Sequence, residues 1–121
     1  MGAGGQGRPT LVNIYGSWCQ PCAREMPLLR DFRALADGRV RLVGIDTEDD
    51  PRLALLFAID LQQHWPALRD DEGVVSRAFG GGAPKTLFVN AAGQVVHVQR
   101  GAFASLVALR ADVRRFLGVA V

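Results

Sequence analysis

The sequence has few of the residues that hold metals or bind nucleic acids, and this sets the first limits on its function. Among 121 residues there are two cysteines, two histidines and a single lysine, Lys85. The formal net charge is +2 and the basic residues are scattered, so nothing indicates nucleic-acid binding. His64 and His97 stand far apart, without the spacing of zinc ligands, and we expect both to lie on the surface without a catalytic partner.

Long apolar segments are also missing. The longest apolar run, Leu53 to Ile59, is far too short to cross a bilayer, and the first five residues lack the charged-then-apolar character of a signal peptide. Any membrane attachment would therefore come through a segment absent from this chain. We expect residues 1–8 to be a flexible leader or an expression remnant. Residues 9–118 should form one compact domain, because 49% of the chain is hydrophobic.

The most reactive stretch is Trp18-Cys19-Gln20-Pro21-Cys22, which contains both cysteines. An apolar strand is expected before it, at Leu11–Tyr15, and an amphipathic helix after it, at 22–36. A C-x-x-C pair between a strand and a helix is typical of a thiol–disulfide redox site. The helix N-terminus favours a thiolate on Cys19, and Cys22 is placed to attack a mixed disulfide formed there.

Two other interpretations of the cysteine pair are less favoured. A structural disulfide closing so short a loop would contribute roughly 2 kcal/mol, and small disulfide scaffolds usually carry more cysteines. A zinc site would need two further ligands, which the distant histidines do not supply. We therefore predict that the dithiol is itself the redox centre and that no cofactor or metal is needed.

The remaining pattern predicts an α/β domain. We expect strands at 40–46, 86–90 and 95–99, an extended segment at 65–69, and helices at 51–61, 74–79 and 104–117. The helix at 51–61 is apolar almost all round, which favours burial over a face that waits for a partner. The helical crossover between the first two strands makes them parallel, and the final pair should form an antiparallel hairpin. This order gives a central mixed β-sheet flanked by helices on both faces, a thioredoxin-like fold.

The segment from Val12 to Pro27 resembles the active-site signature of bacterial thioredoxin-like proteins of the TlpA, ResA and DsbE type. Trp65-Pro66, Gly82-Ala83-Pro84-Lys85-Thr86 and Asn90-Ala91-Ala92-Gly93 also fall where that family has them. The resemblance implies an extracytoplasmic protein, without excluding the cytoplasm, and a monomer with a disulfide-containing protein substrate and an upstream dithiol electron donor. Many such proteins reduce apocytochrome c cysteines during cytochrome maturation, and some relatives oxidise their substrates.

The resemblance also assigns roles to individual residues. Cys19 and Cys22 are the catalytic pair, with Gln20 and Pro21 in the loop between them. Trp18 is expected as a lid beside the disulfide. Pro84 matches the cis-proline of the fold, which together with Ala83 would dock the substrate backbone.

Glu25 matches an acid that the family carries on the first helix, whereas Asn13 stands where thioredoxin has a buried acid. Glu25 is spaced from Leu28, Leu29 and Phe32 so that all four side chains share one side of the predicted helix. Glu25 should therefore point toward apolar surface, where it could relay the proton of Cys22. The alternative is a solvated glutamate stabilised by the helix dipole.

Lys85 departs from the family, because cytochrome-maturation members often have an acid there. We expect it to bring an exposed positive charge to the groove beside Cys19. The sequence therefore predicts a thiol–disulfide oxidoreductase, more a reductase than an oxidase, with an oxidant or a slow-turnover binding module as alternatives.

Overall fold

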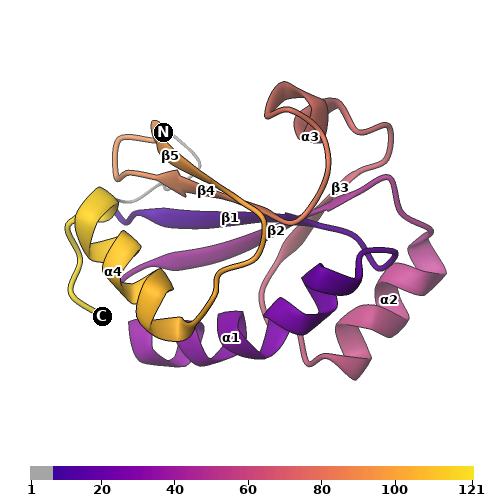
Figure 1. The fold of residues 1–121 in the computed structure, drawn as a ribbon. Coiled ribbons are helices and arrows are strands. Elements are labelled where there is room, and N and C mark those ends of the chain that lie inside the picture. Colours follow the sequence, from indigo (N-terminus) through magenta and orange to yellow (C-terminus); the bar gives the residue numbers. More distant parts are fainter. Residues whose placement is uncertain (1–6) are drawn as a thin grey trace.

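The computed structural model describes residues 7–121, which form one α/β unit (Figure 1). In chain order the elements are β1 (Thr10–Tyr15), α1 (Gln20–Ala36), β2 (Arg41–Thr47), α2 (Pro51–Asp60), β3 (Ala67–Asp70), α3 (Val74–Ala78), β4 (Lys85–Val89), β5 (Val95–Arg100) and α4 (Leu106–Leu117). Each predicted element is present, with ends that differ by one or two residues in most cases. None of the helices in this part of the chain is long and apolar enough to cross a membrane.

The five strands make one mixed sheet in the order β3-β2-β1-β4-β5. β1 lies in the centre, parallel to β2 on one side and antiparallel to β4 on the other. β4 and β5 form the predicted antiparallel hairpin. All six residues of β1 are buried, as the continuous apolar run of its sequence predicts for a strand covered on both faces.

The two faces of the sheet carry separate cores. Side chains of alternate β1 residues, such as Leu11 and Tyr15, pack with α1, α4 and Phe57 of α2. Val12 and Ile14 point to the opposite face, where Val75 and Phe79 pack against them. Figure 1 shows this division, with α1, α2 and α4 below the sheet and α3 above it. The predicted arrangement of helices on both faces is confirmed, and the active-site strand belongs to both cores.

The ends of the described chain are held by hydrogen bonds. Arg8 Nη1 donates to Gly38 O at 3.3 Å, while residues 1–6 of the predicted leader lie outside the described part. At the other end, Arg39 Nη1 donates to Ala120 O at 2.7 Å, and Val119 and Val121 pack against the α1 core. Contacts of the domain therefore continue past the predicted boundary at residue 118.

The prediction that α2 is mostly buried is wrong. Only Phe57 of this helix is buried, stacked on Tyr15 with 5.5 Å between ring centroids. Four apolar side chains of the helix, Leu53, Leu55, Leu56 and Ile59, are at least half exposed. Ala54 and Ala58 are half-buried, so two small side chains and Phe57 are the covered part of this helix.

His97 also differs from the prediction of a surface residue. Its ring stacks on Phe116 with 3.9 Å between centroids and meets the edge of Phe88. It is part of an aromatic cluster between β5 and α4, whereas His64 is exposed as expected.

Candidate active site

Cys19 is the N-cap residue of α1, and its sulfur is bonded to that of Cys22 in the first turn. The Cys22 backbone N–H donates to Cys19 Sγ at 3.2 Å. Pro21 occupies the first turn, where a helix has no use for a backbone donor. In the reduced protein the same N–H and the helix dipole would stabilise a thiolate on Cys19, because both place positive charge at that sulfur.

The cysteine pair is more enclosed than its place at a helix start suggests. Cys19 is 4% exposed and Cys22 is 1% exposed, so exposure alone separates the two only slightly. Trp18, immediately before Cys19, is 52% exposed and is the large apolar side chain of the redox loop that solvent reaches. The stronger distinction between the cysteines is the N-cap position of Cys19, which gives its sulfur the helix N–H group.

The end of β2 and the loop after it hold the redox loop in place. Asp49 accepts hydrogen bonds from Ser17, at 2.7 Å from the backbone N–H and 2.5 Å from the hydroxyl. Trp18 Nε1 donates to Thr47 O at 3.0 Å. The indole lies so close over Gly16 that a Cβ there would stand 2.2 Å from Trp18 Nε1, so only glycine fits. This conformation of Trp18 therefore depends on both loops.

Glu25 is a buried carboxyl group on α1, one turn after Cys22. It is 3% exposed, and its two oxygens accept hydrogen bonds from Asn13 Nδ2 at 3.3 Å and from the Phe103 N–H at 2.9 Å. Burial raises the pKa of Glu25 above its ordinary value, although the hydrogen bonds from Phe103 and Asn13 oppose the rise. The orientation predicted from its helix spacing is confirmed, and the solvated alternative is wrong.

The peptide bond between Ala83 and Pro84 is cis, as predicted. Gly80, Gly81 and Gly82 precede it with φ angles of 96°, 73° and 79°, a left-handed run that side chains would strain. Within residues 7–121, neither the N–H nor the C=O of Ala83 has a hydrogen-bond partner. Ala83 packs against the core cluster that contains both cysteines. A free backbone edge of this kind can pair with an extended polypeptide.

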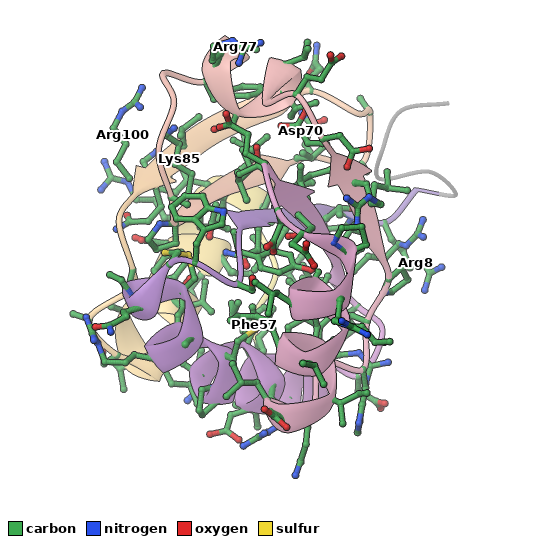
Figure 2. The ribbon with its side chains drawn as sticks, turned by 90° about the vertical axis from the view of Figure 1, so that its right-hand side faces the viewer. Arg8, Phe57, Asp70, Arg77, Lys85 and Arg100 are labelled. Carbon is green, nitrogen blue, oxygen red and sulfur yellow. A yellow bond between two sulfur atoms is a disulfide. The ribbon has the colours of Figure 1, made fainter. Side chains whose placement is uncertain are left out.

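Lys85 contradicts the prediction of an exposed charge beside Cys19. It is 4% exposed, and its Nζ donates to the carbonyls of Gly81 and Gly82. Burial, and then the neighbouring Arg100 charge, lower the pKa of Lys85. Arg100, near Lys85 in Figure 2, donates from Nη1 to Phe79 O at 3.0 Å, so the two cations bind carbonyls within and just before the run of glycines. The long apolar stem of lysine let it fold back into the protein.

Asp46, near the end of β2, and Asp49, in the loop that follows, form an acid pair close to the support of Trp18. Asp46 is buried, and its Oδ1 has no hydrogen-bond partner among the described residues. Burial, and then the hydrogen bond and charge of Asp49, raise the pKa of Asp46 to about 7. Burial would also raise the pKa of Asp49, but its hydrogen bonds with Asp46 and Ser17 outweigh this and lower it.

This pair predicts a pH-dependent stability. Since the pKa of Asp46 is about 7 in the folded chain and near 4 when unfolded, the folded state binds more protons between these values. Its stabilising contribution is complete below about pH 4 and is lost as the pH rises through 7. We expect Asp46→Asn to gain roughly 2–4 kcal/mol relative to the wild type between pH 4 and 8.

Urea unfolding at pH 4, 6 and 8 measures this difference, with Asp31→Asn on the exposed side of α1 as the matched control. A constant difference between Asp46→Asn and the wild type across this range would show that Asp46 is ionised in the folded protein.

The sequence prediction missed several residues that shape the site. Asn13 appeared only as a neutral residue in place of an acid, and no role in the site was expected for Asp49. The Phe103 N–H carries no side-chain signal, because a backbone group donates the hydrogen bond. An apolar strand containing one asparagine was the signal that could have identified Asn13.

Comparison with known proteins agrees with this geometry. Residues 3–112 match the Redoxin family. Over 98 residues the chain is 34% identical to the thiol:disulfide interchange protein CycY of Rhizobium leguminosarum bv. viciae, covering 79% of this chain and 52% of that protein. The chain thus spans about half the length of the curated relatives that it matches.

Two solved structures have the same fold. One is dsbF from MTB, in mixed oxidised and reduced forms, with 27% identity and a TM-score of 0.80 over 91% of this chain and 81% of that one. The other is a secreted Mycobacterium tuberculosis disulfide oxidoreductase homologous to E. coli DsbE, with 26% identity and a TM-score of 0.78 over 91% and 83%. The chain therefore belongs to the Redoxin family and has the thioredoxin-like fold of its thiol:disulfide interchange members.

Proposed function

We propose that the chain is a thiol–disulfide oxidoreductase that reduces disulfides of extracytoplasmic proteins, with apocytochrome c as the substrate class. The observation that carries the proposal is the Cys19–Cys22 disulfide at the start of α1, with the buried Glu25 one turn beyond it. The names of the relatives, thiol:disulfide interchange proteins, support this type of reaction. The description of one structural relative as secreted supports a place outside the cytoplasm.

In the proposed reaction the Cys19 thiolate attacks one sulfur of a substrate disulfide. A mixed disulfide forms, and the other substrate sulfur leaves as a thiolate. Cys22 then gives its proton to Glu25, and its sulfur attacks Cys19 Sγ. The Cys19–Cys22 disulfide forms, and the second substrate sulfur leaves and takes up a proton. Two electrons pass to the substrate, and an upstream dithiol donor must restore the reduced chain.

Substrate docking is proposed at the exposed Trp18 and at the free backbone edge of Ala83 before Pro84. An extended substrate strand could pair with that edge while its disulfide lies beside Cys19. The buried Lys85 brings little charge to the docking surface, because its amine is held by loop carbonyls. We propose that the chain acts as a monomer without metal or other cofactor.

The direction of electron flow is tested by the reduction potential. The hydrogen bond from the Cys22 N–H to Cys19 Sγ favours the thiolate and an oxidising potential. A carboxylate at Glu25 opposes the thiolate. Since Gln20 and Pro21 add no charge, we expect a potential near the thioredoxin value of about −270 mV. Equilibration in defined redox buffers, followed by thiol labelling, measures it.

A potential above about −180 mV would overturn the reductase and favour a disulfide-forming oxidant. An insulin-reduction assay with dithiothreitol as donor is the second arm of this experiment. Absence of activity there would favour a binding module, for which the exposed leucines of α2 offer a surface.

A further inference from the structure

The side chains of Asn13 and Glu25 are hydrogen-bonded, and the proposed exchange reaction gives Asn13 no role. Asn13 lies in the middle of β1, at the centre of the sheet, and is completely buried. Its Nδ2 stands 3.3 Å from Glu25 Oε1, on the face of the sheet covered by α1. Asparagine in an otherwise apolar central strand is costly unless its amide is hydrogen-bonded, so this position has a specific task.

The two polar atoms of the Asn13 amide differ in their hydrogen-bond partners. Nδ2 is surrounded by oxygen atoms: Glu25 Oε1, and at 3.5 Å both Lys85 O and Thr86 Oγ1. Oδ1 is enclosed and has no hydrogen-bond partner among the described residues. Burying an acceptor without a partner costs free energy that a simple structural asparagine would avoid. The unpaired oxygen indicates a second arrangement of the site in which it is used.

We propose that Asn13 is a positioning residue that supports Glu25 in both of its protonation states by turning its side-chain amide over. When Glu25 is a carboxylate, Asn13 Nδ2 donates to it, as in the structure. When Glu25 has taken the Cys22 proton, a half-turn about the Asn13 Cβ–Cγ bond exchanges Nδ2 and Oδ1. Oδ1 then accepts the hydrogen bond of the Glu25 hydroxyl.

Two of the neighbouring groups fit both orientations. The Thr86 hydroxyl can accept from Nδ2 or donate to Oδ1, and the Phe103 N–H donates to Glu25 Oε2 in either state. The half-turn gives up the long contact with Lys85 O, sets Oδ1 opposite that carbonyl, and moves Nδ2 into the enclosed space that Oδ1 leaves. Cys19 and Cys22 lie on the same helix as Glu25, the Lys85 amine on β4 is occupied by loop carbonyls, and the Tyr15 hydroxyl of β1 donates to Gln63. Arg24, Asp31 and Arg33 of α1 are exposed. This inference rests on the proposed function, because Glu25 must exchange a proton with Cys22.

The amide rotation can be observed in the wild-type protein. In reduced, isotope-labelled protein, NMR follows the side-chain NH₂ signals of Asn13 and the carboxyl carbon of Glu25 through a pH titration. We expect both to change with the same midpoint, and Glu25→Gln to remove the change at Asn13. Asn13 signals that stay constant while Glu25 titrates would overturn the proposal.

Substitutions at Asn13 give a second test, read from the pH dependence of thiol alkylation. Asn13→Ala should raise the Glu25 midpoint by about one pH unit, because the carboxylate loses a donor. Asn13→Thr, whose hydroxyl both donates and accepts, should restore at least half of the shift. Neither change should move the profile in a Glu25→Gln background. Equal shifts for alanine and threonine, or a shift that persists without Glu25, would show a merely structural role.

The two proposals fail separately. If insulin is not reduced but Asn13 still follows the titration of Glu25, the proposed function falls and the Asn13 assignment stands. If insulin is reduced while the Asn13 signals stay constant, the proposed function stands and the Asn13 assignment falls. The NMR titration needs no variant at Asn13, so it decides even if the buried substitutions prevent folding.

Discussion

Cys22→Ser should accumulate as a mixed disulfide with its protein substrate, because Cys19 can attack but nothing within the chain can release it. Cys19 holds the N-cap position and the N–H bond to its sulfur, whereas Cys22 is 1% exposed inside the first turn. An intramolecular thiol has a very high effective concentration, so external thiols at millimolar levels should leave turnover lower by about 10³-fold or more. Non-reducing electrophoresis followed by mass spectrometry detects the trapped species.

Cys19→Ser is the matched control for this experiment. It keeps one cysteine and the same charge, and we expect neither trapping nor turnover. If Cys19→Ser traps partners and Cys22→Ser does not, the attacking and resolving roles are reversed. The experiment is needed because the two sulfurs differ in their position on the helix more than in their exposure.

Glu25→Gln should make the cysteine thiolate easier to form but should slow the release of the mixed disulfide. Removing a buried carboxylate takes away like-charge repulsion, so the apparent pKa of the cysteine pair should fall by about one unit. Release of the mixed disulfide should slow by about 10²-fold near pH 7, because no group remains to accept the Cys22 proton. The amide of glutamine keeps the size of the side chain and an oxygen for the Phe103 N–H, so a large structural change is not expected.

Alkylation rates from pH 4 to 10 measure the first effect, and rapid-mixing fluorescence measures the second. Because the cysteines and Glu25 are coupled, the midpoints belong to the set of groups. Glu72→Gln, an exposed glutamate in the turn before α3, is the control for a general loss of negative charge. Identical profiles for Glu25→Gln and the wild type would remove Glu25 from the reaction.

The sequence was sufficient for the fold because its local signals agree with one another. The apolar run of β1, the proline in the first turn of α1 and the glycine-containing hairpin turn each favour the element that forms. The cysteine pair followed from the C-x-x-C motif between a strand and a helix, and the orientation of Glu25 followed from its helical spacing to apolar residues. The cis peptide at Pro84 came from the resemblance to the family and is confirmed by the structure.

Most of the errors of prediction come from contact between distant parts of the chain. The apolar pattern of α2 indicated burial, but how much of a helix is buried depends on the elements that pack against it. In α2 only Phe57 is buried. The error at Lys85 is local instead, because its amine bends back to the carbonyls of Gly81 and Gly82, four and three residues before it. The partners of Glu25 come from β1 and from residue 103, at sequence separations of 12 and 78.

These separations bear on the order in which the protein becomes functional as it folds. The cysteine pair and the first helix turn are local, and could form while the chain is still being synthesised. β4 pairs with β1 across more than 70 residues, and the Phe103 N–H reaches Glu25 later still along the chain. Contacts between distant residues form late, because loop closure must come first. A nascent chain would carry reactive thiols before it has a docking edge or a complete proton acceptor, and substrate selection would begin only with the last third of the sequence.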